Sequence, residues 1–485
     1  MNRQIACAIV GSISLLLGGC MVGPKYVKPT VPMAPAFKEQ VPDSYKQSDG
    51  WKPAQPSDQA LRGNWWEVFG DPQLNTLEEQ VTASNQDLKV AEARFRQARA
   101  MIRFNRSEEF PTISTSPSIV SERDSAHQPY FPPSLANNGT GAFTLPFDLS
   151  YEVDLWGRVR RTVSASREEA QASAADLQTA NLSLHAELAV DYFELRSADD
   201  QKQLLDNTVA AYTDALKLTQ NRFEGGAAPK SDVAQAQTQL DGARVQDTDI
   251  TVTRAQFEHA IATLIGKPPA EFSITPAPST VMELPVVPVG LPATLLERRP
   301  DIAAGERRVA EANDQIGIAR AAFFPSLVLG ATGGFTGTSI TNWLSWPSRM
   351  WAVGPQLSQT IFDAGRRHAV SEGATANYDA TVASYRQTTL TAFQEVEDNL
   401  AALSILEKEA QQQKEATTSA EESLQLFTNR YQGGVDNYLQ VITAQTVLLT
   451  NQRNDIDIER RLMDASVLLV KAIGGGWDTS QLPRL

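Results

Sequence analysis

The sequence predicts a mixed α and β protein built from two repeats, each with two strands, a very long helix and a shorter return helix. The hexapeptide Asn-Arg-Phe-Glu-Gly-Gly at 221–226 returns as Asn-Arg-Tyr-Gln-Gly-Gly at 429–434, and the same offset of 208 residues relates Gly157 to Gly365. In addition, residues 158–224 contain no glycine and no proline. A repeat this long is not a solenoid unit, so it implies two structurally equivalent halves in one chain.

The N-terminus is predicted to be an export and lipidation signal. An apolar run at 5–17 follows Arg3 and leads into Leu-Gly-Gly-Cys at 17–20. Small residues before a cysteine are typical of a bacterial lipobox, so residues 1–19 are predicted to be a lipoprotein signal peptide, with Cys20 carrying a covalent lipid such as palmitate. The alternative is a plain signal peptide with a chance cysteine. Residues 20–63, rich in proline and polar residues, are predicted to be a lipid-anchored extended tether.

The first repeat is predicted to occupy residues 64–266. Asp71 and Pro72 are suited to the N-cap and first position of a helix. From Phe143 to Leu155 every odd residue is apolar and the even residues are mostly polar, which is typical of a strand with one apolar and one polar face. The predicted elements are a helix, strands at about 111–123 and 141–155, a long helix at 158–224 and a return helix at 231–266.

Seven prolines mark residues 267–293 as a linker between the repeats. The second repeat is predicted at 294–476, with a helix, strands at about 325–336 and 350–362, a long helix at 366–432 and a return helix at 437–473, followed by a tail at 477–485. Heptad-spaced apolar residues along the first long helix, at 158–224, predict coiled-coil packing. The return helices are predicted to be N-capped near Ser231-Asp232 and Asp436-Asn437. They are shorter than the long helices, so another helix must supply the missing length beside each long helix. We expect the helices at 301–322 and from Pro72 to about Arg106 to do this.

The strands are about the length of a tilted strand that crosses a bilayer. A soluble β-sandwich shows the same alternation and is the alternative, but the export signal and the lack of a long apolar helix in the mature chain favour an outer-membrane barrel. Four strands cannot close a barrel, because about eight is the usual minimum and open edges leave backbone groups unsatisfied in lipid. The barrel must therefore be shared between two or three copies. Trp343, Trp346 and Trp351 would either anchor at the membrane interface or cap the extracellular mouth.

Composition and motifs exclude several classes of function. The 485 residues carry a net charge of −14, which argues against nucleic-acid binding. The four histidines are scattered without ligand spacing, so no metal site is predicted. No acid–base or nucleophile constellation proposes an active site or a cofactor, and the chain is not expected to be an enzyme.

The chain resembles the TolC-like outer-membrane factors, in the NodT-type branch of efflux lipoproteins. The resemblance rests on the lipobox, Asn-Trp-Trp-Glu-Val-Phe-Gly-Asp-Pro at 64–72, residues 149–158, Leu-Pro-Ala-Thr-Leu-Leu-Glu-Arg-Arg-Pro-Asp at 291–301 and the paired Gly-Gly sequences. It implies a homotrimer whose 12-stranded β-barrel, four strands per chain, is continuous with a long α-helical coiled-coil barrel. It further implies a passive export duct in the cell outer membrane, lipid-anchored and extending into the periplasm. The implied partners are a periplasmic adaptor (membrane fusion) protein and an inner-membrane pump of the resistance-nodulation-division class.

The resemblance also gives the tips of the helical hairpins two roles, docking the adaptor and closing the tunnel at rest. The residues concerned are Arg222, Gly225, Gly226, Ser231, Arg430, Gly433, Gly434, Asp436 and Leu439. Leu439 would form an apolar ring in the trimer, whereas Thr443 stands where relatives often carry an acidic residue. The alternative is that the glycines and caps only shape the turns. Two rival functions are a periplasmic structural or adaptor lipoprotein without a pore, and a lipid-anchored surface enzyme.

Overall fold

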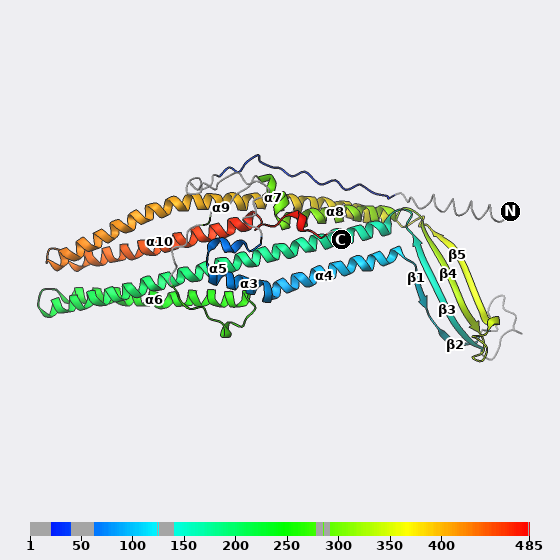
Figure 1. Cartoon of the computed structure of the whole chain (residues 1–485), viewed down its shortest axis with the longest axis horizontal. Helices are drawn as coiled ribbons and strands as arrows, with labels where there is room; N and C mark the ends of the chain where they lie inside the picture. Colours follow the sequence, from blue (N-terminus) through cyan, green and yellow to red (C-terminus); the bar gives the residue numbers. More distant parts are fainter. Residues whose placement is uncertain are drawn as a thin grey trace.

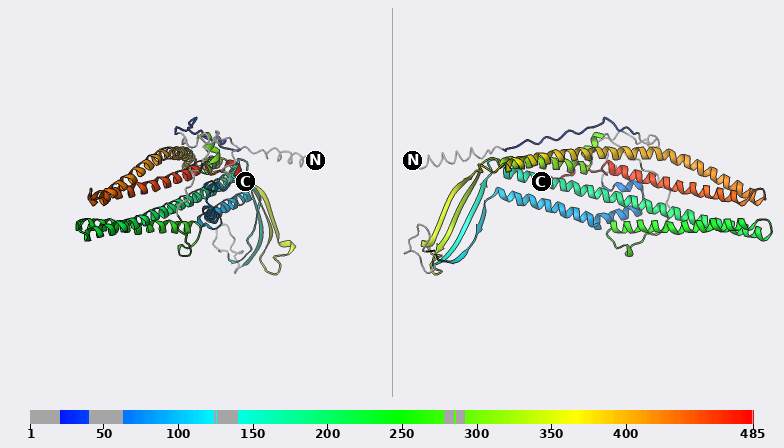
Figure 2. Two further views of the ribbon diagram at one scale, coloured as in Figure 1. Left: turned by 60° about the vertical axis from the view of Figure 1, so that its left-hand side comes forward. Right: turned by 180° about the vertical axis from the view of Figure 1, so that it is seen from behind.

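The chain consists of two long helical hairpins and one antiparallel sheet (Figure 1). The computed structural model describes residues 21–39, 63–123, 125, 140–277, 285, 292–483 and 485. The sheet extends from one end of the helices and bends away from their axis, while both hairpin turns lie at the opposite end (Figure 2). Among the described residues, no helix is both long and apolar enough to cross a membrane.

The two hairpins have matching lengths. The long helices α5 (Arg158–Glu224) and α9 (Arg366–Gln432) have 67 residues each, and the return helices α6 (Lys230–Leu264) and α10 (Tyr438–Ala472) have 35 each. At a rise of 1.5 Å per residue, each long helix is about 100 Å long. Its length follows from the absence of proline, because proline is the main residue that stops a helix.

Two shorter helices, α4 (Gln86–Arg106) and α8 (Pro300–Ala321), continue the lines of α6 and α10 (Figure 1). Each follows a short helix in the chain, α3 (Pro72–Ser84) before α4 and α7 (Pro292–Arg298) before α8. The helix predicted from Pro72 to about Arg106 is therefore two helices, divided at Asn85. The side-chain Oδ1 of Asn85 caps α4, and its Nδ2 donates at 2.8 Å to the carbonyl of Leu264 at the end of α6. This hydrogen bond satisfies a helix-terminal carbonyl that has no partner within its own helix.

The ends of the return helices fit closely against the breaks in the other helices. Gly266 has a φ of 71°, and a Cβ built there would lie 2.5 Å from the Ser84 carbonyl oxygen. Gly474 has a φ of 96°, and its Cβ would lie 2.1 Å from the Arg298 carbonyl oxygen. Both positions therefore require glycine for conformation and for space.

The sheet is antiparallel throughout, in the order β1-β3-β4-β5, with β2 also paired to β3. Its strands are β1 (Thr112–Thr115), β2 (Ser118–Glu122), β3 (Thr140–Val153), β4 (Ser326–Gly337) and β5 (Arg349–Ser358). The β3–β4 ladder joins segments from the two halves of the sequence. In register, Ile113 pairs with Leu149, Leu149 with Ala331, and Ala331 with Val353, so apolar residues share one face.

Two predicted strands need correction. The strand expected at 111–123 is interrupted at Ser116 and Pro117, because Pro117 lies beside the stretch of β3 that holds Pro146 and neither proline has an N–H for the ladder. The hydroxyl of Thr115 instead donates to the Pro146 carbonyl at 2.7 Å. The strand expected at 350–362 ends at Ser358, since its pairing partner β4 begins at Ser326.

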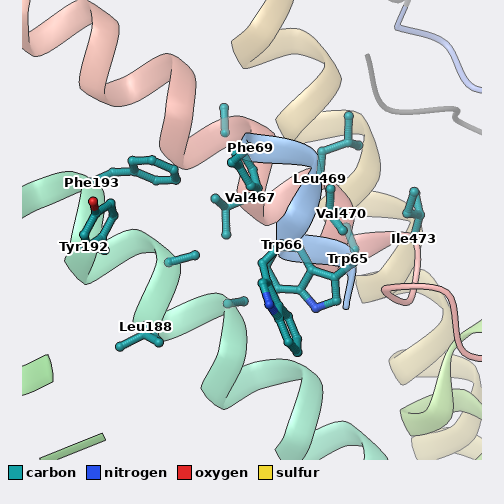
Figure 3. Packing of buried hydrophobic residues seen from close by; sticks show 14 of the residues in the cluster. Trp65, Trp66, Phe69, Leu188, Tyr192, Phe193, Val467, Leu469, Val470 and Ile473 are labelled. Atoms are coloured by element: carbon teal, nitrogen blue, oxygen red, sulfur yellow. The ribbon is translucent and has the colours of Figure 1, made fainter. Parts of the chain in front are cut away.

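The main core lies where the short helices meet the long ones. Trp65, Trp66 and Phe69 in a 3-10 turn (Trp65–Phe69) insert between α5 and α10 (Figure 3). They pack against Leu188, Tyr192, Phe193, Val467, Leu469, Val470 and Ile473. All three aromatic residues are at most 6% exposed, so this turn is fixed between α5 and the C-terminal part of α10.

A buried acid and histidine lie within this core. His185 Nδ1 is 2.5 Å from Glu78 Oε2, its Nε2 is 3.2 Å from Thr82 Oγ1, and its ring stacks on Trp66. Burial raises the pKa of Glu78 to about 9 and lowers the pKa of His185 to about 4. The pair is therefore neutral near pH 7, with the Glu78 carboxylic acid donating to Nδ1 and Nε2–H donating to Thr82.

Replacing Glu78 with glutamine should flatten the pH dependence of stability. Above pH 6.5, where the unfolded histidine is already neutral, folded Glu78 keeps a proton up to a pKa of about 9 that the unfolded chain has lost. The free energy of unfolding of the wild type should thus fall by up to about 1.4 kcal/mol per pH unit across this window. Urea unfolding of both proteins at several pH values measures this slope, and parallel curves for the two proteins would contradict the assignment.

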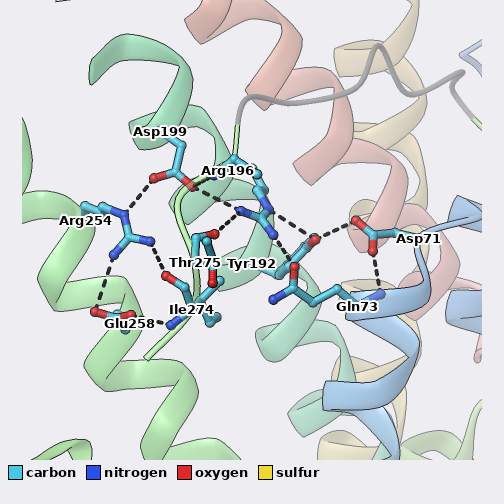
Figure 4. A network of polar contacts seen from close by, with 10 residues as sticks. Asp71, Gln73, Tyr192, Arg196, Asp199, Arg254, Glu258, Ile274 and Thr275 are labelled. Carbon is cyan, nitrogen blue, oxygen red and sulfur yellow. Dashed lines mark hydrogen bonds and ion pairs between the residues drawn. The ribbon is translucent and has the colours of Figure 1, made fainter. Parts of the chain in front are cut away.

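A polar network ties the start of the predicted linker to the helices (Figure 4). Arg196 on α5 donates to Tyr192 Oη at 3.1 Å and to the Thr275 carbonyl at 3.3 Å. Arg254 on α6 donates to Asp199 at 2.6 Å and to the Ile274 carbonyl at 2.6 Å. The first part of the region expected at 267–293 is thus anchored, and α7 begins one residue before that region ends.

The described part of the predicted tether lies along the helices as an extended strap, residues 21–39 (Figure 1). At one end, the Val22 N–H donates to the Trp156 carbonyl at 3.1 Å. At the other, the N–H groups of Lys38 and Glu39 donate to Glu397 on α9 at 2.7 and 2.9 Å. The strap therefore follows the surface from the junction of sheet and helices toward the hairpins. The predicted signal peptide and Cys20 lie outside the described residues.

Candidate functional site at the hairpin tips

Both hairpin turns have the same backbone geometry. Each long helix is followed by a glycine with negative φ and then by one with positive φ, 76° at Gly226 and 74° at Gly434. The Ala227 N–H donates to the Arg222 carbonyl at 2.7 Å, and the equivalent bond in the second turn is 2.9 Å long. This is the Schellman arrangement, in which a left-handed residue closes a helix. A Cβ at Gly226 or Gly434 would contact nothing within 4 Å, so the positive φ alone requires glycine at these two positions.

The return helices begin differently from the prediction. The N-cap residue of α6 is Pro229, whose fixed φ places the chain at the helix entrance, and neither Ser231 nor Asp232 caps the helix. Ser231 is exposed in the first turn, whereas Asp232 is buried. Asn437 does occupy the N-cap position of α10, but its side chain makes no capping hydrogen bond.

Arg430 and Asp436 form a two-bond ion pair across the second turn. The guanidinium donates to the two carboxylate oxygens at 2.6 and 3.0 Å. These hydrogen bonds hold the pKa of Asp436 below its ordinary value. The pair closes the turn on itself, so the negative charge of Asp436 is matched within its own hairpin.

Arg222 links the two hairpins. Its Nη1 donates to the Gln432 carbonyl at 3.0 Å, and its guanidinium lies 4.7 Å from the centre of the Tyr431 ring. A cation over an aromatic face is attracted by the ring quadrupole. The first turn is therefore held against the second by one charged side chain.

A small apolar cluster lies next to both turns, between the adjoining ends of the hairpin helices. Its buried members come from all four hairpin helices: Tyr212, Leu216, Ala236, Leu240, Ala243, Tyr431, Tyr438 and Val441. The Tyr431 and Tyr438 rings are 5.1 Å apart, and burial raises the pKa of Tyr438 to about 12. Because this cluster spans both hairpins, the tips form one site.

Three apolar side chains at the tips remain exposed. Leu439 is 51% exposed, Val435 69% and Phe223 42%. Thr443, one turn beyond Leu439, donates its hydroxyl to the Leu439 carbonyl at 2.9 Å. Large apolar side chains at an exposed tip are characteristic of a surface that contacts another protein. Only Leu439 was identified from the sequence. Phe223 lies two residues before Gly225 in the first turn and Val435 directly follows Gly434 in the second, and this position beside the glycines was the available signal.

Farther along the helices from the tips, α6 and α10 meet through polar contacts spaced seven residues apart. Gln239 donates to Thr446 at 3.1 Å, and Arg453 donates to Gln246 at 3.0 Å. A groove of about 410 Å³ lies beside these contacts. The contact between α6 and α10 is thus polar and has a groove beside it, in contrast to the apolar cluster nearer the tips.

The structure brings the sequence-identified tip residues to one end of the molecule. Gly225 and Gly433 occupy the C-cap positions of α5 and α9, and Arg222, Arg430, Gly226, Gly434, Asp436, Ser231 and Leu439 lie within the turns or the adjoining helical turns. The described part of the chain contains no group of three or more His, Cys, Asp or Glu side chains placed to hold a metal ion.

The tryptophans near the second hairpin of strands lie at the far end of the sheet from the helices. Trp346 and Trp351 are 73% and 77% exposed, and Arg349 lies 4.3 Å from the Trp346 ring. Trp343 packs against Phe143 of β3 with ring centres 5.9 Å apart. Trp343 therefore takes part in packing, whereas the other two present their rings outward.

Comparison with known proteins places this architecture in a family. The model of the family described as "Outer membrane efflux protein" matches residues 77–267 and 291–475. The chain is 33% identical to the "Probable efflux pump outer membrane protein SepC" of Pseudomonas putida over 96% of both chains. It is 31% identical to "Outer membrane protein OprJ" of Pseudomonas aeruginosa over 96% of this chain and 95% of OprJ.

A solved structure of similar shape supports the same assignment. The outer-membrane channel OprN superimposes with a TM-score of 0.85 at 29% identity, covering 94% of this chain and 100% of OprN. The sequence match extends over both halves and the structural match over nearly the whole chain. On these findings, the chain belongs to the outer membrane efflux protein family.

Proposed function

We propose that this chain is the outer-membrane channel component of a tripartite efflux pump and acts as a passive export duct. The observation that carries the proposal is one elongated body with a two-faced sheet at one end and paired hairpin turns at the other. The two long helices are each about 100 Å long, a length suited to spanning a periplasm. The duct performs no catalysis in this proposal, because the pump supplies the energy.

The exposed apolar face of the sheet supports its insertion into lipid. Its exposed apolar residues include Ile113, Ile119, Phe147, Leu329, Val353 and Leu357. The opposite face is polar, and there Thr332 donates to Asp148 at 2.6 Å. An apolar outer face and a polar inner face are the pattern of a water-filled barrel.

The unpaired edges support a shared barrel. Within the chain, one edge of the β1/β2 segment and one edge of β5 have no strand beside them among the described residues. Backbone groups along such edges are costly to leave unpaired in lipid. Three copies, each pairing β5 with β1 and β2 of the next, would close a twelve-stranded barrel, with β1 and β2 counted as one interrupted strand.

The matched lengths of the helices support two structural repeats. The long helices have 67 residues each and the return helices 35 each, and the equivalent glycines have similar positive φ. Repeats of this kind would let six hairpins of a trimer alternate around a helical tunnel that continues the barrel.

The tips are the proposed docking surface for a periplasmic adaptor, whose partner would be an inner-membrane pump of the resistance-nodulation-division class. Phe223, Val435 and Leu439 offer exposed apolar contacts at the end that would face the inner membrane. The Arg222 link between the hairpins would help to keep the tunnel closed at rest. The same turns would therefore serve for docking and for gating.

The strap supports lipidation of Cys20. Met21 lies against Gly157 at the junction of sheet and helices, where a Cβ on the glycine would be 2.5 Å from Met21 Cγ. The residue before Met21 would thus reach the inner surface of the outer membrane. Replacing Cys20 with alanine should abolish acylation, seen by mass spectrometry, while the oligomer still assembles in the membrane because the barrel inserts by itself. Loss of the oligomer in this variant would show that the lipid is required for insertion.

The proposal is tested by the mass and conductance of the detergent-solubilised protein. A trimer that conducts ions in planar bilayers is expected. A lone subunit that stays monodisperse without detergent and shows no conductance would instead support the structural or adaptor lipoprotein.

A further inference from the structure

The helix α4 is strongly basic in an acidic protein. It carries six lysine and arginine residues and only two acidic residues, Asp87 and Glu92, whereas the whole chain has a net charge of −14. Only Leu88 of this helix is fully buried. The cations are therefore on the surface, and their distribution around the helix decides what they can contact.

Five of the six cations fall on one side of the helix. They are spaced by three, four or seven residues, which aligns them along the axis. This basic stripe consists of Lys89, Arg96, Arg99, Arg103 and Arg106. All five side chains are exposed, and Glu92 is the one acidic residue at the same spacing.

Most of the stripe has no carboxylate partner. Among the described residues, no carboxylate lies within ion-pair distance of Arg96, Arg99 or Arg103, and Arg99 lies only over the Phe95 ring at 5.8 Å. Arg106 pairs with Glu109 at 3.6 Å at the end of the helix. Elsewhere in the chain arginines such as Arg254, Arg299 and Arg460 each contact at least two carboxylates. The positive potential along α4 is thus left unmatched.

The helices α4, α5 and α8 lie side by side as one layer, and a groove of about 540 Å³ lies on one face of it. The basic stripe lies on the opposite side of this layer. That groove is lined from α4 by Arg94, Gln97, Ala98, Met101 and Asn105, and by none of the five stripe residues. From α8 it is lined by Glu311 and Gln315. The groove therefore takes one flank of α4, and the stripe occupies the other.

The strap lies on the same side of the layer as the stripe. On α8 it contacts Asn313, whose Nδ2 donates to the Pro24 carbonyl at 3.3 Å, and Gly317, beside Gly23. Residues two apart on a helix point about 200° apart. Asn313 therefore faces away from Glu311 and Gln315, so strap and groove are on opposite faces of the layer.

In the proposed duct, the face that carries the strap is the outside. The strap leads to Cys20, and its acyl chains must enter the membrane around the barrel, not the lumen. The basic stripe then runs along the outer wall, from the junction with the sheet toward the hairpins. The 21 residues of α4 give it a length of about 30 Å, roughly normal to the membrane.

We propose that the basic stripe of α4 binds an extended polymer bearing carboxylates, namely the glycan–peptide network of the cell wall. This inference rests on the proposed function, because a duct of this length anchored in the outer membrane must pass through that layer. A flat bilayer would reach only the Arg106 end of a stripe that runs along its normal. A second copy would meet the remaining exposed side of α4, which carries Val90, Ala93, Ala100 and Phe104.

The test compares two triple variants with the same change in charge. In one, Arg96, Arg99 and Arg103 become glutamine; in the matched control, the exposed Lys217, Lys408 and Lys414 of α5 and α9 become glutamine. Each purified oligomer is sedimented with isolated cell-wall sacculi at low and high salt, and floated with vesicles containing phosphatidylglycerol. A third variant with lysine at the three stripe positions keeps the charge.

We expect the wild type, the control and the lysine variant to sediment with sacculi at low salt and to be released at high salt. The glutamine stripe variant should bind about tenfold more weakly, the size expected for losing three exposed ion pairs. Absence of binding by the wild type, or equal binding by both glutamine variants, would overturn the proposal. A stripe variant that loses only vesicle binding would also overturn it, in favour of lipid headgroups. Oligomer mass and conductance are measured on the same samples, so that a failure of the proposed duct is seen separately.

Discussion

Alanine in place of Gly474 should lower the free energy of unfolding by about 2–5 kcal/mol, since two costs add. The residue has a φ of 96°, which an L side chain rarely adopts, and its Cβ would lie 2.1 Å from the Arg298 carbonyl oxygen. That oxygen belongs to the backbone of the last residue of α7 and cannot rotate away. Thermal and urea unfolding of the purified protein, followed by circular dichroism, measures the loss.

Gly434→Ala provides the control for this experiment. Gly434 has a similar positive φ of 74° but open space around its Cβ position. It should lose only the conformational cost of about 1–2 kcal/mol. Equal losses in the two variants would mean that the helix ends are not closely packed, and that the line of α10 and α8 adjusts freely.

Glutamine in place of Gly434 should reduce crosslinking to the adaptor, and efflux with it, by about tenfold or more, while the oligomer remains intact. A long side chain at the point of the turn would stand between Val435 and any partner that covers the exposed apolar residues. Loss of a hot-spot contact near the centre of an interface costs about 2 kcal/mol or more. Site-specific crosslinking and drug susceptibility of cells that carry the variant provide the measurements.

Gly70→Gln is the matched control for the tip variant. Gly70 also has positive φ, 66°, with nothing within 4 Å of its Cβ position, but it lies beside the core of the molecule and not at the tips. Its backbone strain is comparable, so efflux should stay near the wild-type level. If both variants export normally, the tips do not dock the adaptor through this turn.

Local signals were sufficient to predict the long helices and their turns. The absence of proline and the Gly-Gly pairs gave the bounds 158–224 and 366–432, which are those of α5 and α9. Both features act within a few residues of chain, and a single sequence displays them directly.

Contacts between distant segments could not be predicted. The break at Asn85 depends on the Leu264 carbonyl, and the interruption of the first strand depends on Pro146 lying beside Pro117. In the site, the sequence identified the glycines and charged residues of each turn, but not that Arg222 reaches Tyr431 in the other hairpin. Such pairings need the register of helices and strands that only the folded chain defines.

The β3–β4 ladder has a consequence for assembly. It pairs Phe143–Val153 with Leu327–Gly337, so the two halves of the sheet are already joined when one chain folds. A closed ring made from single halves would have to form twice as many seams by collision as the proposed trimer. Because the two halves are covalently continuous, half of these collisions between separate chains are not needed to close the barrel. This continuity also shortens the time during which unpaired strand edges are exposed to the membrane.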